Sequence, residues 1–97
     1  MEDVELARLG KIKITCGENH SLDLYISFEL EIYERGNVEW KIPISDHIQV
    51  QEFFKAIGTS NLDNCVGQLC FVYIKDNTLN KIYSLDRENV WERIREN

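Results

Sequence analysis

Proline, glycine and long apolar runs are all scarce in this chain. One proline occurs in 97 residues, and the five glycines are too scattered to form a glycine-rich phosphate-binding loop. No apolar run approaches the ~20 residues that a helix needs to cross a bilayer. A hydrophobic content of 43% is typical of a globular protein. We therefore expect one globular domain over residues 1–97, with no membrane contact.

Cysteine and histidine are also few, which limits catalytic and metal chemistry. Cys16-x3-His20 and Cys65-x4-Cys70 do not form the compact cysteine knuckles of structural zinc sites. Only His20 and His47 are available as bases, and neither belongs to a recognisable catalytic triad. An odd number of cysteines, three, favours free thiols over disulfides. We expect no catalytic residue, no metal site, no cofactor and no enzyme activity.

Basic residues are the minority charge. Eleven Lys and Arg stand against 17 Asp and Glu, which gives a net charge of −6. This balance disfavours direct nucleic-acid binding, since phosphate contacts require Lys and Arg. It permits an acidic surface complementary to a basic partner protein, or a charge that serves solubility alone. The acidic start, Met1–Glu5, differs from a secretory signal, so we expect a cytoplasmic protein.

The chain is rich in one pattern, a two-residue alternation from Leu22 to Tyr33. This period predicts a β-strand whose two faces differ in polarity. The apolar positions are Leu22, Leu24, Ile26, Phe28, Leu30 and Ile32. The opposite positions are Asp23, Tyr25, Ser27, Glu29, Glu31 and Tyr33. The sequence therefore predicts a sheet with one buried face and one acidic, tyrosine-bearing face.

Two shorter alternating segments flank this strand. Residues 11–16 form a candidate hairpin partner, in a register that places Ile14 opposite Leu24. Residues 38–44 alternate again after a turn at residues 34–36. Because Pro43 has no N–H to donate, we expect this third strand to lie at an edge of the sheet.

The register of the second hairpin stays open at this point. One register makes Gly36 left-handed and places Glu31 opposite Glu39, a mildly unfavourable pair of like charges. A shifted register places Glu31 opposite Lys41 instead. Both registers keep every apolar side chain on the buried face, so the pattern does not choose between them.

The next segment predicts a helix. Ser45 or Asp46 can cap its start, Asp46 followed by Gln49 is a capping-box pattern, and Gly58 supplies a C-terminal stop. A single apolar stripe runs along the helix between these two ends. The stripe consists of Val50, Phe53, Phe54 and Ile57. We expect it to cover the buried face of the sheet.

The remaining residues predict two strands and a second helix. Residues 69–74 are apolar throughout, as expected for a strand covered on both faces, and residues 79–85 return as its partner. Asp86 can cap a short final helix with Val90, Trp91 and Ile94 along one face. The expected fold is a single α+β domain of order β-β-β-α-β-β-α. Its sheet is largely antiparallel, with the main helix packed on one face.

The C-terminal half contains a helix end, a glycine after a loop, an apolar strand and a late aromatic residue, in that order. These positions are Ala56-Ile57-Gly58, Leu62, Val66-Gly67, Ile82 and Trp91. The arrangement resembles short accessory proteins of bacteriophages and prophages. That family often has basic residues in the strand after the glycine, where this chain has Gln68, Cys70 and Phe71. The resemblance implies a phage-type accessory protein that binds and blocks host machinery.

These patterns lead to one functional hypothesis. The candidate partner-binding residues are Asp23, Tyr25, Glu29, Glu31, Tyr33 and Glu39. Tyrosine offers contact area at low entropic cost, and carboxylates suit a basic surface. We expect a non-enzymatic, anti-CRISPR-like inhibitor that binds a basic host protein, such as a nucleic-acid-binding effector.

The alternatives belong to other classes. A nucleotide-sequestering oligomer would need basic residues such as Lys11, Lys13 or Lys41 at its site. A virion structural or assembly component would form a stable high-order oligomer. The long strand over residues 22–33 also suits a homodimer formed by edge pairing.

Overall fold

The computed structural model describes residues 3–17, 23–59 and 61–93. Its strands form one six-stranded sheet in the order β3-β2-β1-β4-β5-β6, with every neighbouring pair antiparallel. The elements are β1 (Glu5–Cys16), β2 (Leu24–Ile32), β3 (Gly36–Pro43), α1 (His47–Ile57), a 3₁₀ turn η1 (Leu62–Asn64), β4 (Leu69–Lys75), β5 (Thr78–Tyr83) and β6 (Val90–Glu92). Within the described ranges, no helix is long and apolar enough to cross a membrane.

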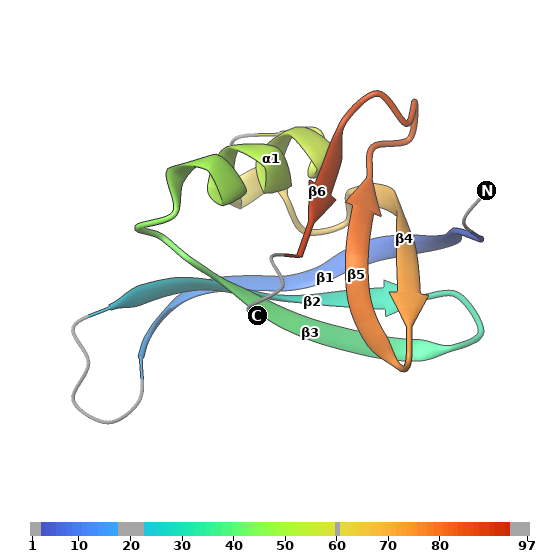
Figure 1. Ribbon diagram of the computed structural model, residues 1–97, viewed down its shortest axis with the longest axis horizontal. Helices are drawn as coiled ribbons and strands as arrows, with labels where there is room; N and C mark the ends of the chain where they lie inside the picture. Colours follow the sequence, from blue (N-terminus) through green and yellow to red (C-terminus); the bar gives the residue numbers. More distant parts are fainter. Residues whose placement is uncertain (1–2, 18–22, 60, 94–97) are drawn as a thin grey trace.

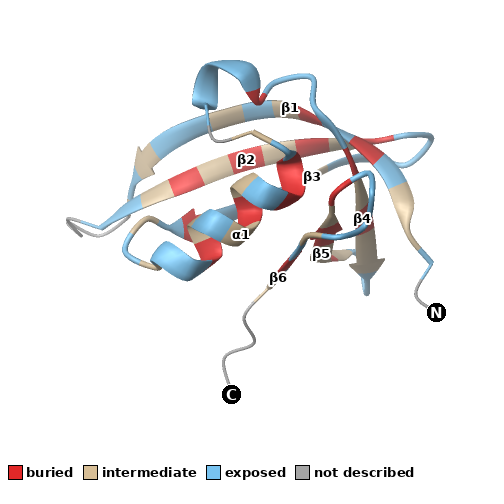
Figure 2. Cartoon of the chain, turned by 90° about the horizontal axis from the view of Figure 1, so that it is seen from above, coloured by how far each residue is buried: buried red, intermediate tan, exposed pale blue. Residues whose placement is uncertain are grey.

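The fold class expected from the sequence is confirmed. Helix α1 lies on the inner face of β1, β2 and β3, while β4 and β5 run steeply across the far end of these strands (Figure 1). The core lies between the helix and the sheet, where the buried residues of both elements meet (Figure 2). The Phe28 ring lies 4.5 Å from the Phe53 ring and 6.1 Å from the Trp91 ring, between centroids.

Strand β2 confirms the predicted alternation from Ile26 to Ile32, whereas Leu24, predicted to face the core, is exposed at the start of the strand. Ile26, Phe28, Leu30 and Ile32 are buried, and the residues between them are half-buried on the other face. Leu22 lies outside the described residues, and Tyr33 belongs to the turn after the strand. Strand β2 lies inside the sheet, between β1 and β3, so its edges are not available for homodimer pairing.

The β1–β2 hairpin differs from the expected one in length and register. Strand β1 begins at Glu5, well before residue 11, and Ile14 lies opposite Ile26 rather than Leu24. The pairing shifts between Leu9 and Lys11, where the intervening glycine forms a bulge. This extra residue breaks the two-residue period, which is why the alternation read from residue 11 did not extend backwards.

Neither expected register of the β2–β3 hairpin is correct. Glu29, rather than Glu31, lies opposite Glu39. The N–H of Arg35 donates to the carbonyl of Ile32 at 3.1 Å, so the turn is short and pairing begins beside it. Gly36 does have the expected left-handed backbone, with φ of 102°. A slip of two residues preserves the buried face, so hydrophobicity alone did not fix the register.

The predicted start and end of α1 are confirmed. The side chain of Asp46 accepts a hydrogen bond from the Gln49 N–H at 3.2 Å, and Gly58 ends the helix with φ of 95°. The Gln49 side chain does not complete a capping box. It is buried instead, where it accepts from the Trp91 ring N–H at 3.2 Å and donates to the Glu92 carbonyl at 3.3 Å. One glutamine thus joins α1 to β6.

The final helix was predicted wrongly, because a turn and strand β6 occupy residues 84–92. Asp86 accepts from the Ser84 hydroxyl and from the Glu88 N–H, much as a helix cap would. However, Arg87 adopts a left-handed backbone with φ of 62°, which reverses the chain instead of starting a helix. Trp91 then reaches full burial from a strand. The expected contact at Ile94 lies outside the described residues.

Strand β4 is buried on one face only, which corrects the expectation that both its faces are covered. Cys70 and Val72 are buried, whereas Phe71 and Tyr73 on the other face are half-buried. The Arg87 guanidinium lies 4.9 Å from the centre of the Phe71 ring and shields part of it. The apolar residues of β4 therefore serve two kinds of packing: one face packs in the core, and Phe71 on the other face packs beneath the Arg87 side chain.

The Gln49 bridge is testable by truncation. In Gln49→Ala, the buried Trp91 N–H loses its partner, so we expect the free energy of unfolding to fall by about 1–3 kcal/mol. The matched control is Gln51→Ala, which removes an exposed glutamine from the same helix and should change stability by less than about 0.5 kcal/mol. Urea unfolding measures both. Equal losses in the two variants would contradict the bridging role.

The turn at residues 84–89 gives a pH-dependent prediction. The Ser84 hydroxyl and the Glu88 amide hold the pKa of Asp86 below its usual value. This contribution is present above the unfolded-state pKa of about 3.9 and is lost as the pH falls through the lowered folded value. We expect Asp86→Ala to melt at a lower temperature than wild type at pH 7, with the difference shrinking in acid. Glu88→Ala, which keeps the same backbone N–H, should show no such pH dependence.

Candidate functional site

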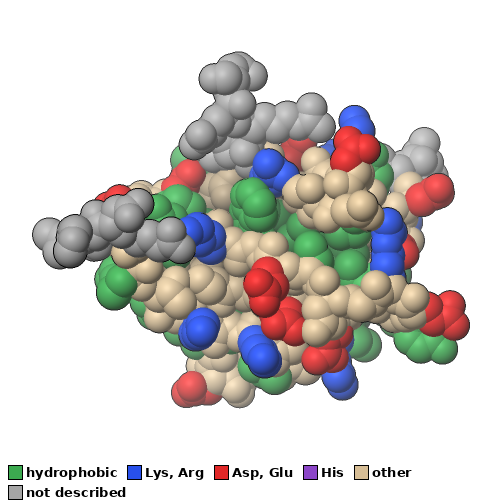
Figure 3. All heavy atoms as spheres, turned by 90° about the horizontal axis from the view of Figure 1, so that it is seen from below, with side chains coloured by type: hydrophobic (Ala, Val, Ile, Leu, Met, Phe, Trp, Pro, Cys, Tyr) green, Lys and Arg blue, Asp and Glu red, His purple; other side chains and the backbone are tan. Residues whose placement is uncertain are grey.

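The outward side chains of β1, β2 and β3 form a surface that we call the polar face. It consists of Arg8, Lys11, Lys13, Thr15, Tyr25, Ser27, Glu29, Glu31, Asn37, Glu39 and Lys41. Seven of these residues line an open depression with a volume of about 1080 Å³. Figure 3 shows this side of the molecule, with basic and acidic side chains interspersed. The face is therefore hollowed and mixed in charge.

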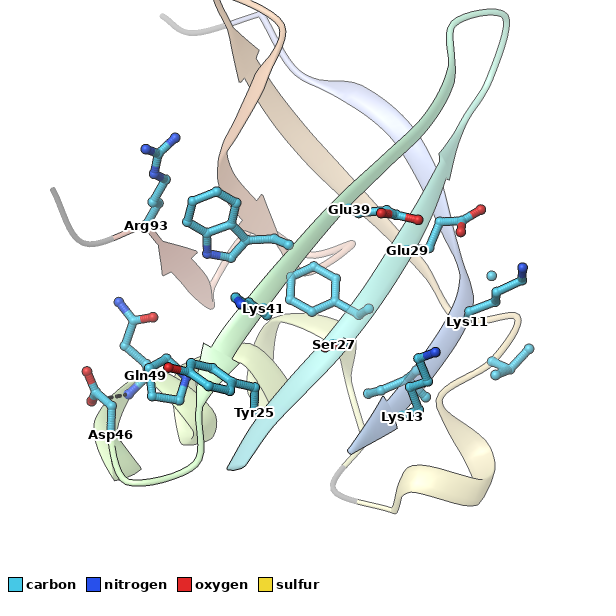
Figure 4. Close-up of a pocket in the computed structure, with 16 residues that line it drawn as sticks. Lys11, Lys13, Tyr25, Ser27, Glu29, Glu39, Lys41, Asp46, Gln49 and Arg93 are labelled. Atoms are coloured by element: carbon cyan, nitrogen blue, oxygen red, sulfur yellow. Dashed lines mark hydrogen bonds between the residues drawn. The ribbon is translucent and has the colours of Figure 1, made fainter. Parts of the chain in front are cut away.

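The strand register arranges the polar face into rows across the three strands. The two central rows are Lys11–Glu29–Glu39 and Lys13–Ser27–Lys41. Directly opposed residues have Cβ atoms about 5 Å apart, and successive rows on one face are about 7 Å apart. In one row two carboxylates face each other, and in the next two ammonium groups flank a serine. Figure 4 shows Glu29 and Glu39 side by side.

The polar face is not acidic as a whole, which changes the interpretation of the sequence. Its four basic side chains outnumber its three acidic ones, although the chain carries a net charge of −6. The basic residues come mainly from β1, which the expected hairpin register had placed differently. The sequence identified the carboxylates of β2 correctly but did not show which cations would lie beside them.

The structure brings four of the six predicted partner-binding residues together. Tyr25, Glu29 and Glu31 share the outer face of β2, and Glu39 joins them from β3. Tyr33 lies in the turn beyond β2, where 77% of its surface is exposed. Asp23 precedes β2 at the opposite end of the strand. The predicted set is therefore one cluster with two residues set apart at its ends.

Local contacts satisfy only part of this surface. Residues 3–17, 23–59 and 61–93 contain two ion pairs, Arg8–Glu31 and Arg35–Glu5. The central rows take part in neither of them. Their contacts are weaker: Asn37 donates to Glu29, and the Lys41 ammonium lies 4.7 Å from the centre of the neighbouring tyrosine ring.

The depression continues around the outer edge of β3 to residues that the sequence did not indicate. Its lining there includes Trp40, Gln49 and Arg93 (Figure 4). The Arg93 guanidinium lies 4.3 Å from the centre of the Trp40 ring, and its buried Nε has no hydrogen-bond partner among the described residues. Trp40 belongs to the alternating segment over residues 38–44, which the sequence predicted only as an edge strand. No sequence pattern indicated that Arg93 would stack on Trp40, since Arg93 belongs to the segment predicted as the final helix.

Two of the three thiols offer little reactivity, and the described residues contain no candidate metal site. Burial raises the pKa of Cys70 to about 12 and also raises that of Cys65, so both stay protonated at neutral pH. Cys65 donates a hydrogen bond to the Asn61 carbonyl at 3.3 Å. Cys16 is exposed on β1. Among the described positions, no group of three or more His, Cys, Asp or Glu could hold a metal ion.

Differential alkylation tests this assignment of the thiols. In native protein at pH 8, iodoacetamide should modify Cys16 and leave Cys65 and Cys70 intact, because both are buried and hold their protons. Mass spectrometry of the digested protein identifies the modified sites. A urea-denatured sample is the control, in which all three should react. Modification of Cys70 at the rate of Cys16 in the native protein would contradict the burial.

Comparisons of the chain with protein-family models, curated proteins and solved structures find no match.

Proposed function

We propose that this chain is a non-catalytic binding protein that contacts another protein through its polar face. The observation that carries the proposal is that the central rows bring like-charged side chains together without giving any of them an ion pair. Glu29 and Glu39 oppose each other, and Lys13 and Lys41 flank the same serine, yet none of the four belongs to an ion pair among the described residues. Like charges directly opposite on a sheet, as Glu29 and Glu39 are, destabilise the pairing.

A binding role explains why like-charged side chains lie close together on this face. A partner that presents a basic group to the Glu29–Glu39 pair relieves the repulsion between these carboxylates, and an acidic group of the same partner fits between Lys13 and Lys41. The depression supplies a concave contact surface, and Tyr25 lies within it. The half-buried tyrosine offers area and a hydroxyl without a large loss of conformational entropy.

The proposed partner is a basic host protein, and the proposed role is inhibition of a host defence factor of the anti-CRISPR-like kind. The net charge of −6 supports this class, since it would steer the protein towards a basic nucleic-acid-binding surface. The order of residues in the C-terminal half resembles that of phage accessory proteins, and this resemblance supports a phage origin for the proposed inhibitor. The mixed charge of the polar face sharpens the expectation, because the contact surface of the partner should carry both signs.

Matched variants test the proposal. Wild type, Glu29→Ala/Glu39→Ala and the control Asp63→Ala/Glu88→Ala would each be used to capture proteins from the native host. Both double variants change the net charge equally, but only the first changes the polar face. We expect one host protein to be retained by wild type and by the control, and to be captured at least about tenfold less by the first variant. Equal capture by all three, with each shown folded by circular dichroism, would refute the assignment of this face.

A further inference from the structure

Strand β3 is an edge strand with a self-complementary sequence. It ends the sheet order, and among the described residues no strand pairs with its outer edge. Residues 38–42 read Val-Glu-Trp-Lys-Ile. Aligned antiparallel with itself about Trp40, this segment places Val38 opposite Ile42 and Glu39 opposite Lys41. An exposed edge of this kind is a template for pairing with another strand.

The backbone N–H and C=O groups of alternate residues in β3 are directed to the outer edge of the sheet. The N–H of Ile44 donates to the carbonyl of Leu24, the residue directly opposite, at 2.9 Å. Hydrogen-bonded positions alternate along an antiparallel strand, so the even-numbered residues of β3 bond to β2. The N–H and C=O groups of Asn37, Glu39 and Lys41 are therefore directed to the outer edge. In the register centred on Trp40, Glu39 and Lys41 form the hydrogen-bonded pairs.

We propose that two copies of this chain form a dimer by antiparallel pairing of β3 with β3, about a two-fold axis at Trp40. Glu39 bonds through its backbone to the partner subunit's Lys41, and symmetry repeats the bonds on the other side of the axis. Asn37 donates its N–H to the carbonyl of the partner subunit's Pro43. The missing N–H of Pro43 leaves one bond unmade at each end, so the pairing stops there.

The side chains favour this occupant over an unrelated strand. Glu39 faces Glu29 on its inner side and has no cation on its outer side among the described residues. Pairing brings the partner subunit's Lys41 beside it. The two central rows then join across the axis as Lys–Glu–Glu–Lys–Ser–Lys and its reverse. A second copy thus places a side chain of opposite charge beside Glu39 and another beside Lys41, and the two-fold axis repeats this arrangement.

The edge is also accessible on both of its faces. The depression is lined by Glu39 and Lys41 on the outer face of β3 and by Trp40 and Arg93 on the inner face. Exposed side chains alternate with half-buried ones from Asn37 to Lys41. This dimer does not rest on the proposed binding function, since it follows from β3 alone. It doubles the polar face by placing two copies side by side in one sheet.

Charge reversal and mixing test the pairing in solution. By sedimentation equilibrium we expect the wild-type chain to be dimeric, and Glu39→Lys and Lys41→Glu alone to dimerise at least about tenfold more weakly. Each variant sets two like-charged pairs across the axis. An equimolar mixture of the two should recover a dimer, because every pair then has opposite signs. The control Lys75→Glu, on an exposed residue at the end of β4, should behave as wild type.

A wild-type mass of 11.4 kDa, that of one chain, at about 1 mM would overturn the proposal. So would variants that stay dimeric separately, or a mixture that gives no heterodimer.

Amide exchange then identifies the interface directly. In the dimer the N–H groups of Glu39 and Lys41 should be protected from hydrogen exchange, although no bond within one chain is expected to protect them. Glu39→Pro removes one of these donors without breaking a bond to β2, so it should yield a folded monomer with an unprotected Lys41 amide. Circular dichroism confirms that the variant is folded. Rapid exchange at both residues in a sample that is dimeric would assign the dimer to another surface and overturn this one.

Discussion

Phe28 contacts the helix and the last strand at once, and the rest of the structure depends on that packing. Its ring meets Phe53 from α1 and, edge-on, Trp91 from β6. All three aromatic side chains are buried, and Gln49 ties the Trp91 ring to the helix by a hydrogen bond. Aromatic burial at one point thus joins segments from the beginning, middle and end of the chain. With its inner face fixed in this way, β2 must turn its polar residues outward.

That constraint produces the polar face and its charge pattern. Because the outer residues of three strands are held in register, like charges are brought together that would separate on a flexible surface. The fold gives some of these side chains an ion pair, as in Arg8–Glu31, and gives none to the central rows among the described residues. The same register directs the backbone of Glu39 and Lys41 to the outer edge of β3. Both the proposed binding function and the proposed dimer therefore arise from the packing of the opposite face.

Much of the fold could be predicted from local patterns, and the failures have physical causes. The cap at Asp46, the stop at Gly58 and the inward residues of β2 each depend on a few neighbouring residues. The final helix failed because Asp86 makes the same contacts in a turn as at a helix start, and the backbone of Arg87 decided between them. The beginning of β1 was missed because a bulge interrupts its alternation.

The candidate site was also predictable only in part, because local patterns fix the face of a residue but not its neighbours on other strands. Tyr25, Glu29 and Glu31 could be assigned to one face, because alternation along a single strand fixes their direction. Which charges lie beside them depends on register, and slips of two residues leave the buried face unchanged. The register that places Ile14 opposite Leu24 puts Lys13 opposite Tyr25, whereas Lys13 lies opposite Ser27. Arg93 could not be placed at all, since its contact with Trp40 joins distant parts of the chain.

By itself the sequence determined the class of fold, the strand that organises it and the identity of its polar residues. Those properties follow from periodicity and from short-range hydrogen bonding, which each segment carries with it. Only the tertiary structure decided that the polar face is mixed in charge, that the backbone groups of Glu39 and Lys41 are directed to the outer edge of β3 and that the last segment is a strand. These outcomes depend on how separate segments meet. Several registers and turns bury the same apolar side chains equally well, so the choice among them requires the whole chain.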